Sequence, residues 1–262
     1  MKKITDILLE LNNASVQRDS KLILNRINLK IAINEQVAIL GPNGSGKSTL
    51  IKLITGDIRP LYHANNPIKL LGETHWVLSE LRHKIGLVSN ELQANYQRKA
   101  SGLNIILSGF DGSIGVFNHN FSKTQLQKAK EISKVLEISH LLEQTINNMS
   151  SGEAKRFLIA RALVHNPQML ILDEPTNSLD IKAQSIVKAS IQNLIIKKQG
   201  LIMVTHQLSD ILQEFSRVIL IKNGKIVADG PRSIVYTAKN ISTLFDMDID
   251  STLQQSASCN LY

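Results

Sequence analysis

Residues 41–49 read Gly41-Pro42-Asn43-Gly44-Ser45-Gly46-Lys47-Ser48-Thr49, which fits the pattern G-x-x-x-x-G-K-[ST] of a phosphate-binding loop. An apolar stretch at residues 37–40 runs into this loop, and a helical pattern begins after it at Leu50. Strand, glycine-rich loop and helix are the context that the motif requires, and they disfavour a plain glycine-rich turn with an exposed lysine. The sequence therefore predicts that loop N–H groups and the positive end of the helix bind nucleotide phosphates.

Two side chains of this loop are suited to a nucleotide. In loops of this pattern the lysine, here Lys47, reaches the β- and γ-phosphates, and the next hydroxyl, here Ser48, is a ligand of Mg²⁺. Gly41, Gly44 and Gly46 carry no Cβ, so the backbone can approach the anion closely and adopt positive φ. The loop is therefore expected to bind a nucleotide together with Mg²⁺.

The composition is that of a globular protein of one large or two small domains. Of 262 residues, 43% are hydrophobic, 20% are charged and only 4% are aromatic, so we expect a core of Ile, Leu and Val. The single cysteine, Cys259, excludes an intrachain disulfide and a cysteine-based metal site, and it fits a reducing compartment. Asp6 and Glu10 argue against a signal peptide, and no apolar run approaches the ~20 residues of a membrane span. We therefore expect a soluble protein.

The net charge of +8 is compatible with nucleic acid, an anionic membrane face or a polyanionic ligand as partner. The basic residues are scattered along the chain, which favours a solvated basic surface without a specific partner. The charge alone decides no function.

Polar residues follow three apolar strands of the chain. The pairs are residues 37–40 with the glycine-rich loop, residues 169–172 with Asp173-Glu174, and residues 201–204 with Thr205-His206. Helical patterns separate these strands, and such alternation favours a parallel α/β sheet, in which ligands bind at the carboxyl ends of the strands. The three polar sites are therefore expected at one edge of the sheet.

The remaining segments predict an antiparallel part, a helical insert and a tail. Residues 7–33 are typical of β-strands joined by a turn at residues 17–21, and residues 218–227 of a hairpin around Asn223-Gly224. From about residue 91 to 151, helical spacing replaces the strand signals after a glycine-rich start. We expect a single domain over residues 1–248, with this insert inside it, and a polar, disordered tail over residues 249–262.

Two further stretches of the sequence contain motifs that belong with the glycine-rich loop and the polar strand ends. Residues 149–163 read MSSGEAKRFLIARAL, and residues 170–180 read LILDEPTNSLD. Together with the loop and Thr205-His206, in this order and spacing, they resemble the nucleotide-binding subunit of ABC transporters over about residues 7–248. The resemblance implies an α/β fold: a P-loop NTPase (RecA-like) core, an antiparallel β subdomain and a helical insert subdomain.

The resemblance also implies roles for the residues at the strand ends. Asp173 would hold Mg²⁺ together with Ser48, and Glu174 would be the general base on the attacking water. His206 would contact the γ-phosphate and that water, with Lys47 completing the catalytic set. Taken singly, each of these residues also has a structural reading, as a strand-end carboxylate or a core histidine.

Residues 149–153 lie where the family has its signature sequence, followed by the signature helix at residues 154–163, and the resemblance assigns this stretch to a site on a second copy of the chain. Ser150 and Gly152 head a helix, where N–H groups favour an anion, and the resemblance implies that they bind the γ-phosphate of an ATP held by a second subunit. Two such subunits would enclose two ATP molecules head to tail, with Ser178 and Asp180 at the interface. A homodimer of nucleotide-binding subunits is therefore expected.

Three positions depart from the commonest pattern of the family. Ser151 stands where a glycine is usual, which affects affinity or rate without removing the site. Asn90 stands at the place of a metal-contacting glutamine; it keeps the amide with a shorter reach, and Gln93 is the alternative. Arg18 stands near the place of an adenine-stacking aromatic residue, and it either stacks on the base through its guanidinium plane or is a solvated turn residue.

The sequence thus predicts an ATP-hydrolysing subunit that binds ATP and Mg²⁺ and drives transport through transmembrane permease subunits. It would be cytoplasmic, bound to the inner face of the cell membrane through the permease only, with no nucleic-acid partner. Residues 108–117 and 229–245 resemble importer-type subunits related to iron-chelate and molybdate uptake. The alternative is a soluble ABC ATPase that acts on nucleic acid or the ribosome, against which the chain has one nucleotide domain and no coiled-coil or zinc-binding insert. A P-loop kinase or GTPase is disfavoured by the signature helix and by the absence of a guanine-reading Asn-Lys-x-Asp motif.

Overall fold

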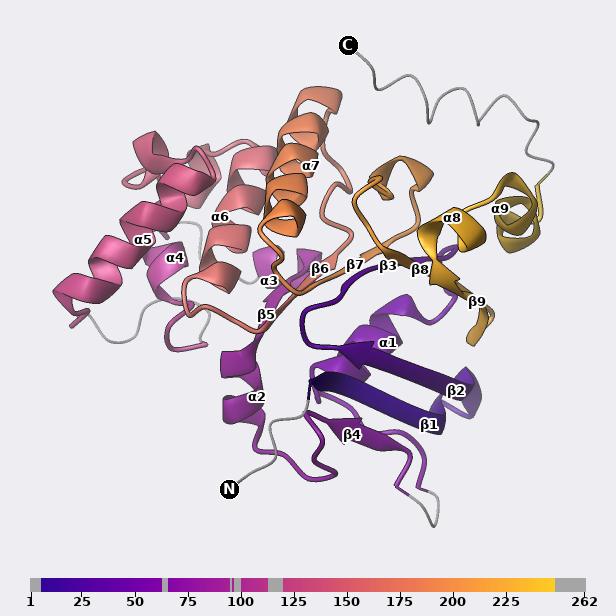
Figure 1. Ribbon diagram of the computed structural model, residues 1–262. Coiled ribbons are helices and arrows are strands. Elements are labelled where there is room, and N and C mark those ends of the chain that lie inside the picture. The colour runs from indigo at the N-terminus through magenta and orange to yellow at the C-terminus, as the bar shows by residue number, and fades with distance from the viewer. Residues whose placement is uncertain (1–5, 63–65, 95, 97–99, 113–119, 248–262) are drawn as a thin grey trace. The chain divides into compact units, whose positions relative to one another are not determined.

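A computed structural model describes residues 6–62, 66–94, 96, 100–112 and 120–247 (Figure 1). The chain forms two compact units. The first unit comprises Met1–Ala32, Gln36–Thr74 and Val204–Tyr262, and the second unit comprises Ile33–Glu35 and His75–Met203. Among the helices of the described ranges, none combines the length and apolar character that a membrane crossing requires.

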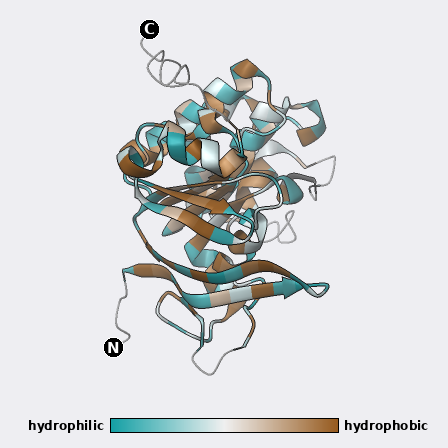
Figure 2. Cartoon of the chain, turned by 90° about the vertical axis from the view of Figure 1, so that its right-hand side faces the viewer, coloured by the Kyte–Doolittle hydropathy of each residue, from teal (hydrophilic) through white to brown (hydrophobic). Residues whose placement is uncertain are grey.

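The first unit contains an antiparallel sheet in the strand order β2-β1-β4. Its strands are β1 (Ile7–Arg18), β2 (Lys21–Ala32) and β4 (Ile68–Leu70). Asp19 and Ser20 join β1 to β2 with φ of 48° and 63°, as a two-residue turn of type I′ requires, so the predicted turn is confirmed. Buried and exposed residues alternate along β2, and Figure 2 shows hydrophobic and hydrophilic colours changing along the long strands.

The first unit also holds β3 (Gln36–Leu40), which pairs in parallel with β8 (Arg217–Lys222), and β9 (Lys225–Pro231), which is antiparallel to β8. Asn223 and Gly224, with φ of 49° and 72°, form the predicted Asn-Gly turn between β8 and β9. The helices of this unit are α1 (Lys47–Ile54), η3 (Leu208–Asp210), α8 (Arg232–Val235) and α9 (Ala238–Phe245).

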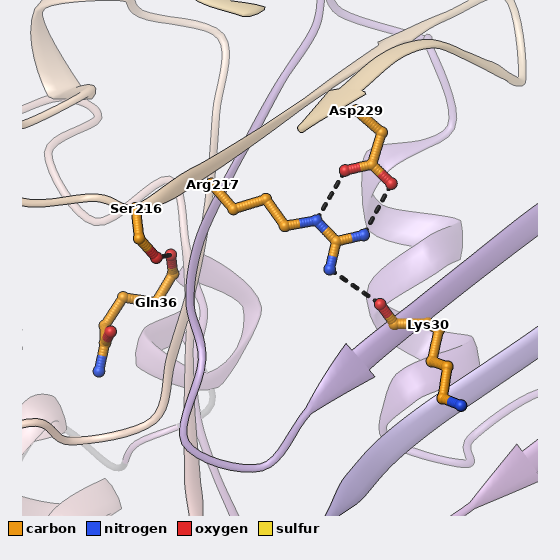
Figure 3. A network of polar contacts seen from close by, with 5 residues as sticks. All are labelled: Lys30, Gln36, Ser216, Arg217 and Asp229. Carbon is orange, nitrogen blue, oxygen red and sulfur yellow. Dashed lines mark hydrogen bonds and ion pairs between the residues drawn. The ribbon is translucent and has the colours of Figure 1, made fainter. Parts of the chain in front are cut away.

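One polar network joins three strands of the first unit (Figure 3). The guanidinium group of Arg217 on β8 donates two hydrogen bonds of 2.7 Å each to the carboxylate of Asp229 on β9. Its Nη1 donates to the backbone oxygen of Lys30 on β2 at 2.9 Å, while the neighbouring Ser216 Oγ donates to the Gln36 oxygen at 3.2 Å. Arg217 therefore ties the β8–β9 hairpin to the antiparallel sheet.

The second unit is built around β5 (Ile85–Val88) and β6 (Met169–Asp173), which are neighbours in the strand order, and it includes residues 201–203 of β7 (Leu201–Thr205), which is next to β6. The strands β5 and β6 are parallel, with Ile85 opposite Met169 and Val88 opposite Leu172. The helices are α2 (Leu78–Lys84), α3 (Asn90–Ala94), α4 (Gly102–Leu107), α5 (Lys123–Val135), η1 (Ser139–Leu141), η2 (Ile146–Asn148), α6 (Ser151–Leu163) and α7 (Ile181–Ile196).

Helix α6 is the centre of the second unit. It contacts α4, α5, α7 and β5 (Figure 1). Its residues are buried on nearly all sides. A capping box starts this helix: the Ser150 Oγ accepts from the Glu153 N–H, and the Glu153 carboxylate accepts from the Ser150 N–H. Because the helix has no solvated face, its charged residues need partners inside the protein.

The predicted mixture of an antiparallel sheet, parallel strands and helices is confirmed. The segment predicted as a helical insert holds α3, α4 and α5 within the second unit, while its extent as a subdomain stays a prediction. Residues 113–119 and the tail from residue 248 lie outside the described residues, so the disorder expected over residues 249–262 stays a prediction as well.

Candidate nucleotide-binding site

The glycine-rich loop lies between β3 and α1 in the first unit, as predicted. A Cβ at Gly41 would lie 2.2 Å from the Ile221 oxygen, and one at Gly46 would lie 2.7 Å from a methyl carbon of Leu24. Gly46 has a φ of 104°, a conformation that side chains other than that of glycine rarely adopt. The backbone therefore requires glycine at these two places, and it forms a loop that stands clear of side chains at Gly44.

Helix α1 begins without a side-chain cap. Its N-cap is Gly46, which offers no acceptor to the first N–H groups, and the first turn contains no acidic residue. The N–H groups at the start of a helix need an acceptor from elsewhere, and together with the helix dipole they favour an anion. The start of α1 therefore has the features of a phosphate site.

Lys47 is folded into the loop. Its side chain is buried, and its Nζ donates to the backbone oxygens of Gly41 at 2.8 Å and of Pro42 at 2.9 Å. The Ser45 Oγ is also buried, and it has no hydrogen-bond partner among the described residues. Ser48, the predicted metal ligand, is exposed. The loop thus offers a cation, uncapped N–H groups and an accessible hydroxyl.

The end of β7 brings His206 to the same loop. The Gly41 N–H donates to the Thr205 oxygen at 3.3 Å, so the first residue of the loop lies against the residue before His206. The Thr205 hydroxyl donates to the buried Asp210 carboxylate at 2.7 Å and accepts from the Gln207 N–H at 3.0 Å. These bonds hold the turn that carries His206, which is half-buried.

Asp173 and Glu174 follow β6 in the second unit, as predicted. Glu174 has a φ of 49°, a left-handed conformation that is uncommon for a residue other than glycine. Its carboxylate accepts from the Asn177 amide nitrogen at 3.1 Å, which fixes the direction of the side chain. A strained carboxylate that is held by a neighbour is typical of functional sites.

Lys155 lies near the carboxylates of Asp173 and Glu174, and the sequence had suggested no role for it. It is 1% exposed, and its Nζ donates to the Asn90 side-chain oxygen at 2.7 Å. Burial lowers the pKa of Lys155, and the nearby carboxylates of Asp173 and Glu174 oppose that effect. The sequence did contain a signal for such a contact. Lys155 lies on the same face of the helix as Gly152 and Ile159, which are both buried, and a buried ammonium group needs polar partners.

The signature residues lie at the start of α6. Ser150 is exposed, and its Oγ donates to the Glu153 carboxylate at 2.8 Å. Hydrogen bonds from Ser150, chiefly that of its backbone, lower the pKa of Glu153. A Cβ at Gly152 would lie 2.7 Å from the Cβ of Ala183 on α7, so packing between the two helices requires glycine there.

Three further residues were predicted near the nucleotide or the interface: Arg18, Asp180 and Gln93. The Arg18 side chain is 81% exposed and lies 3.6 Å from the Asp19 carboxylate. Asp180 caps α7 by accepting from the Ala183 N–H at 2.7 Å. The side chain of Gln93 lies outside the described part of the chain. Adenine stacking by Arg18 and the choice between Asn90 and Gln93 stay predictions.

A comparison with known families decides the assignment. The family model described as ABC transporter matches residues 24–177, which are more than half of the chain and include the loop, Ser150 and Glu174. The chain belongs to the ABC transporter family.

Relatives of this ABC protein include import subunits. The hemin import ATP-binding protein HmuV of Hahella chejuensis is 30% identical over 245 residues, which are 89% of this chain and 91% of the relative. The molybdate/tungstate import ATP-binding protein WtpC of Methanocaldococcus jannaschii is 34% identical over 235 residues, 89% of this chain and 74% of the relative. The importer-type resemblance is thus confirmed.

A solved structure of similar fold is a dimeric ATP-binding cassette in a post-hydrolysis state, bound to ADP and Pi. It superposes with a TM-score of 0.67 at 26% sequence identity, covering 86% of this chain and 98% of the other. This ABC protein is therefore an ATP-binding, ATP-hydrolysing subunit of a transporter, as predicted. The alternative of an ATPase that acts on nucleic acid or the ribosome is not favoured.

Proposed function

We propose that this ABC ATPase hydrolyses ATP in sites shared by two copies of the chain and thereby drives transport through transmembrane permease subunits at the inner face of the membrane. The observation that carries the proposal is the loop at Gly41–Thr49, where the Lys47 ammonium group and the uncapped start of α1 form a phosphate site. The exposed Ser150 at the start of α6 would complete the site of the other copy, where the partner's γ-phosphate would replace the Glu153 carboxylate as the acceptor of its N–H and hydroxyl.

Each residue of the proposed site has a chemical task. Lys47 and the loop N–H groups bind the phosphates and stabilise the charge that develops on the transferred group. Glu174, directed by Asn177, accepts the proton of the attacking water, and His206 donates a hydrogen bond to the γ-phosphate. Gly152 allows the close packing of α6 against α7. The Ser150 N–H and hydroxyl, which donate to Glu153 in the single chain, would bind the phosphate of the other copy.

Mg²⁺ fits the oxygens that the chain offers. In the described ranges, no group of three or more His, Cys, Asp and Glu residues could hold a metal ion, so a resident metal cage is absent there. Mg²⁺ is commonly bound through one or two protein oxygens together with substrate phosphates, and Ser48 and Asp173 are such residues. When bound, Mg²⁺ neutralises phosphate charge. Whether the Asn90 side-chain oxygen is a third ligand depends on Lys155, which donates a hydrogen bond to that oxygen.

The proposed transport is import. The names of two relatives describe hemin import and molybdate/tungstate import, and both relatives match about nine-tenths of this chain. These cargoes differ in chemistry, and the ATPase does not contact cargo, so the proposal names the direction of transport and leaves the cargo open. The partners are transmembrane permease subunits, through which the chain would be held at the membrane.

Mixing two inactive variants tests the shared site. Lys47→Ala disables the loop of its own copy, and Ser150→Asp keeps an efficient helix cap but sets a negative charge against the partner's phosphate. Each variant alone should be nearly inactive, and a mixture should regain about a quarter of wild-type ATPase activity, because half of the dimers contain one intact site. Ser150→Asn, which is also a good cap, is the neutral control. A mixture no more active than its components would contradict the shared site.

A further inference from the structure

Lys155 is a buried cation that the proposed reaction does not yet use. It lies on α6, four residues after the exposed first residue of that helix, and its side chain is 1% exposed. Its ammonium group reaches across 65 residues of sequence to the Asn90 side chain at the start of α3. A lysine is rarely buried to this degree without a specific partner, so this contact needs an explanation.

The contact fixes which way the Asn90 amide points. An ammonium group has three hydrogen-bond donors and no acceptor, so it can only bond to the oxygen of the amide. The Asn90 Oδ1 lies 2.7 Å from the Lys155 Nζ, at the distance of a charge-assisted bond. The amide nitrogen of Asn90, a donor, and the second lone pair of its oxygen are consequently what remains for a ligand.

This arrangement works against a metal ion on Asn90. Mg²⁺ binds oxygen at about 2.1 Å, so an ion on the same oxygen would lie about 4 Å from the ammonium nitrogen. Two cations at that separation repel each other, and the repulsion is stronger in a partly buried site than in water. The Asn90 oxygen can therefore bind Mg²⁺ only if its hydrogen bond with Lys155 breaks.

Lys155 also compensates charge. The carboxylates of Asp173 and Glu174 are near enough to favour its charged form against the effect of burial. Removal of Asn90 would leave the ammonium group with these carboxylates, whereas removal of Lys155 would leave them without their buried cation. Through one side chain, α6 is thus linked to α3 and to the end of β6.

We propose that Lys155 is a positioning residue that holds Asn90 by its oxygen, so that Asn90 donates a hydrogen bond in the ATP site and is not a Mg²⁺ ligand. The inference rests on the proposed function, in which Ser48 and Asp173 are the Mg²⁺ ligands. It gives Asn90 a different role from the metal contact that the resemblance implies.

A Mg²⁺ titration of nucleotide binding tests this role. The full-length protein is titrated with Mg²⁺ in the presence of the non-hydrolysable analogue AMPPNP, and the Mg²⁺ concentration at half-maximal binding is measured. Asp173→Asn, which removes the negative charge of a ligand, should raise this concentration about 10-fold or more, whereas Asn90→Ala should change it by less than about twofold. Asn90→Ala should still lower the rate of ATP hydrolysis, because the donor is lost.

Variants of Lys155 test whether its hydrogen bond is what keeps the Asn90 oxygen from Mg²⁺. In Lys155→Met the Asn90 oxygen is released, so adding Asn90→Ala to this variant should now weaken Mg²⁺ binding severalfold, while Lys155→Arg should behave as the wild type. Thermal unfolding without Mg²⁺ reports the contact even if Lys155→Met fails to fold: Asn90→Asp, which forms an ion pair with Lys155, should unfold at a higher temperature than Asn90→Ala.

An Asn90→Ala variant that raises the half-maximal Mg²⁺ concentration as much as Asp173→Asn would overturn the inference. The same holds if Asn90→Asp is no more stable than Asn90→Ala. Failure of the proposed function would look different, since the wild-type protein would then bind no AMPPNP at any Mg²⁺ concentration.

Discussion

Glu174 combines the carboxylate of the proposed general base with a left-handed backbone. Its φ of 49° costs energy for a residue with a Cβ, and such conformations persist only where the surroundings enforce them. Here the chain turns sharply after β6, with the Asn177 N–H and amide nitrogen bonded to the oxygens of Glu174. The strained turn directs the carboxylate to one place, which is what a general base requires.

His165 makes stability depend on pH. It lies after α6, its ring meets that of His83 edge to face, and neither of its ring nitrogens has a hydrogen-bond partner among the described residues. Burial, with a smaller effect of His83, lowers the pKa of His165 to about 4. The unfolded chain, with a histidine pKa of about 6.5, then binds more protons than the folded one between these two values.

The folded state should therefore lose stability as pH falls from about 6.5 towards about 4, and His165 should have no such effect above about 6.5. Urea unfolding midpoints measured from pH 7.5 to pH 4.5 report the slope. His165→Phe, which has a similar ring and no proton, should flatten it. An equally steep slope in that variant would assign the pH dependence to other groups.

At the residue scale, sequence predicted the loop residues, Asp173, Glu174 and His206 at strand ends, where the structure has them. It could not predict the partner of Lys155, because the contact with Asn90 joins residues 65 positions apart and no local pattern records it. The left-handed Glu174 was likewise invisible, since a carboxylate after a strand carries no sign of its backbone angle.

At the scale of elements, the first unit depends on a contact between sheets. The guanidinium group of Arg217 donates two hydrogen bonds to the Asp229 carboxylate. The side chains of Arg217 and Asp229 are 20% and 27% exposed. A paired guanidinium group that also bonds a backbone oxygen on β2 fixes orientation as well as distance. Within the hairpin, β8 is anchored by buried apolar residues, whereas β9 alternates between exposed and half-buried residues and gains a polar anchor from this pair.

Arg217→Lys should lower the free energy of unfolding by about 1–2 kcal/mol, because a lysine cannot form the paired bonds and reach Lys30 at once. Chemical denaturation at neutral pH measures the loss. Lys30→Ala is the control, since Lys30 takes part through its backbone oxygen while its side chain extends away from Arg217 (Figure 3). Equal stability of Arg217→Lys and wild type would show that the network is only a surface contact.

Sequence predicted elements best where turn chemistry and periodicity agree, as in the Asn223-Gly224 hairpin. Strand β1 was harder, because the pattern of apolar residues breaks at Asn13, which has a φ of 55° in an irregular stretch of the ladder between Leu11 and Ala14. The Asn28 side chain accepts from the Asn13 N–H at 2.8 Å and stabilises this irregularity. A partner on another strand thus decides what the local sequence leaves open.

At the scale of the whole molecule, each unit carries part of the proposed machinery. The first unit holds the phosphate loop and His206, and the second unit holds Asp173, Glu174, Lys155 and the signature residues at the head of α6. The exposed Ser150 belongs to the surface that is proposed to bind the phosphate of the other copy, and its own loop is not proposed to use it. On this account a monomer has little ATPase activity, and ATP joins two copies.

The Glu174→Gln variant tests this central claim most directly. It keeps the shape of the side chain and removes the base, so ATP should bind, remain uncleaved and hold two copies together. Size-exclusion chromatography coupled to light scattering, with Mg²⁺ and saturating ATP, should show a dimer, and the Lys47→Ala/Glu174→Gln double variant should remain a monomer. Glu174→Gln protein that binds ATP and still elutes as a monomer would contradict the shared site.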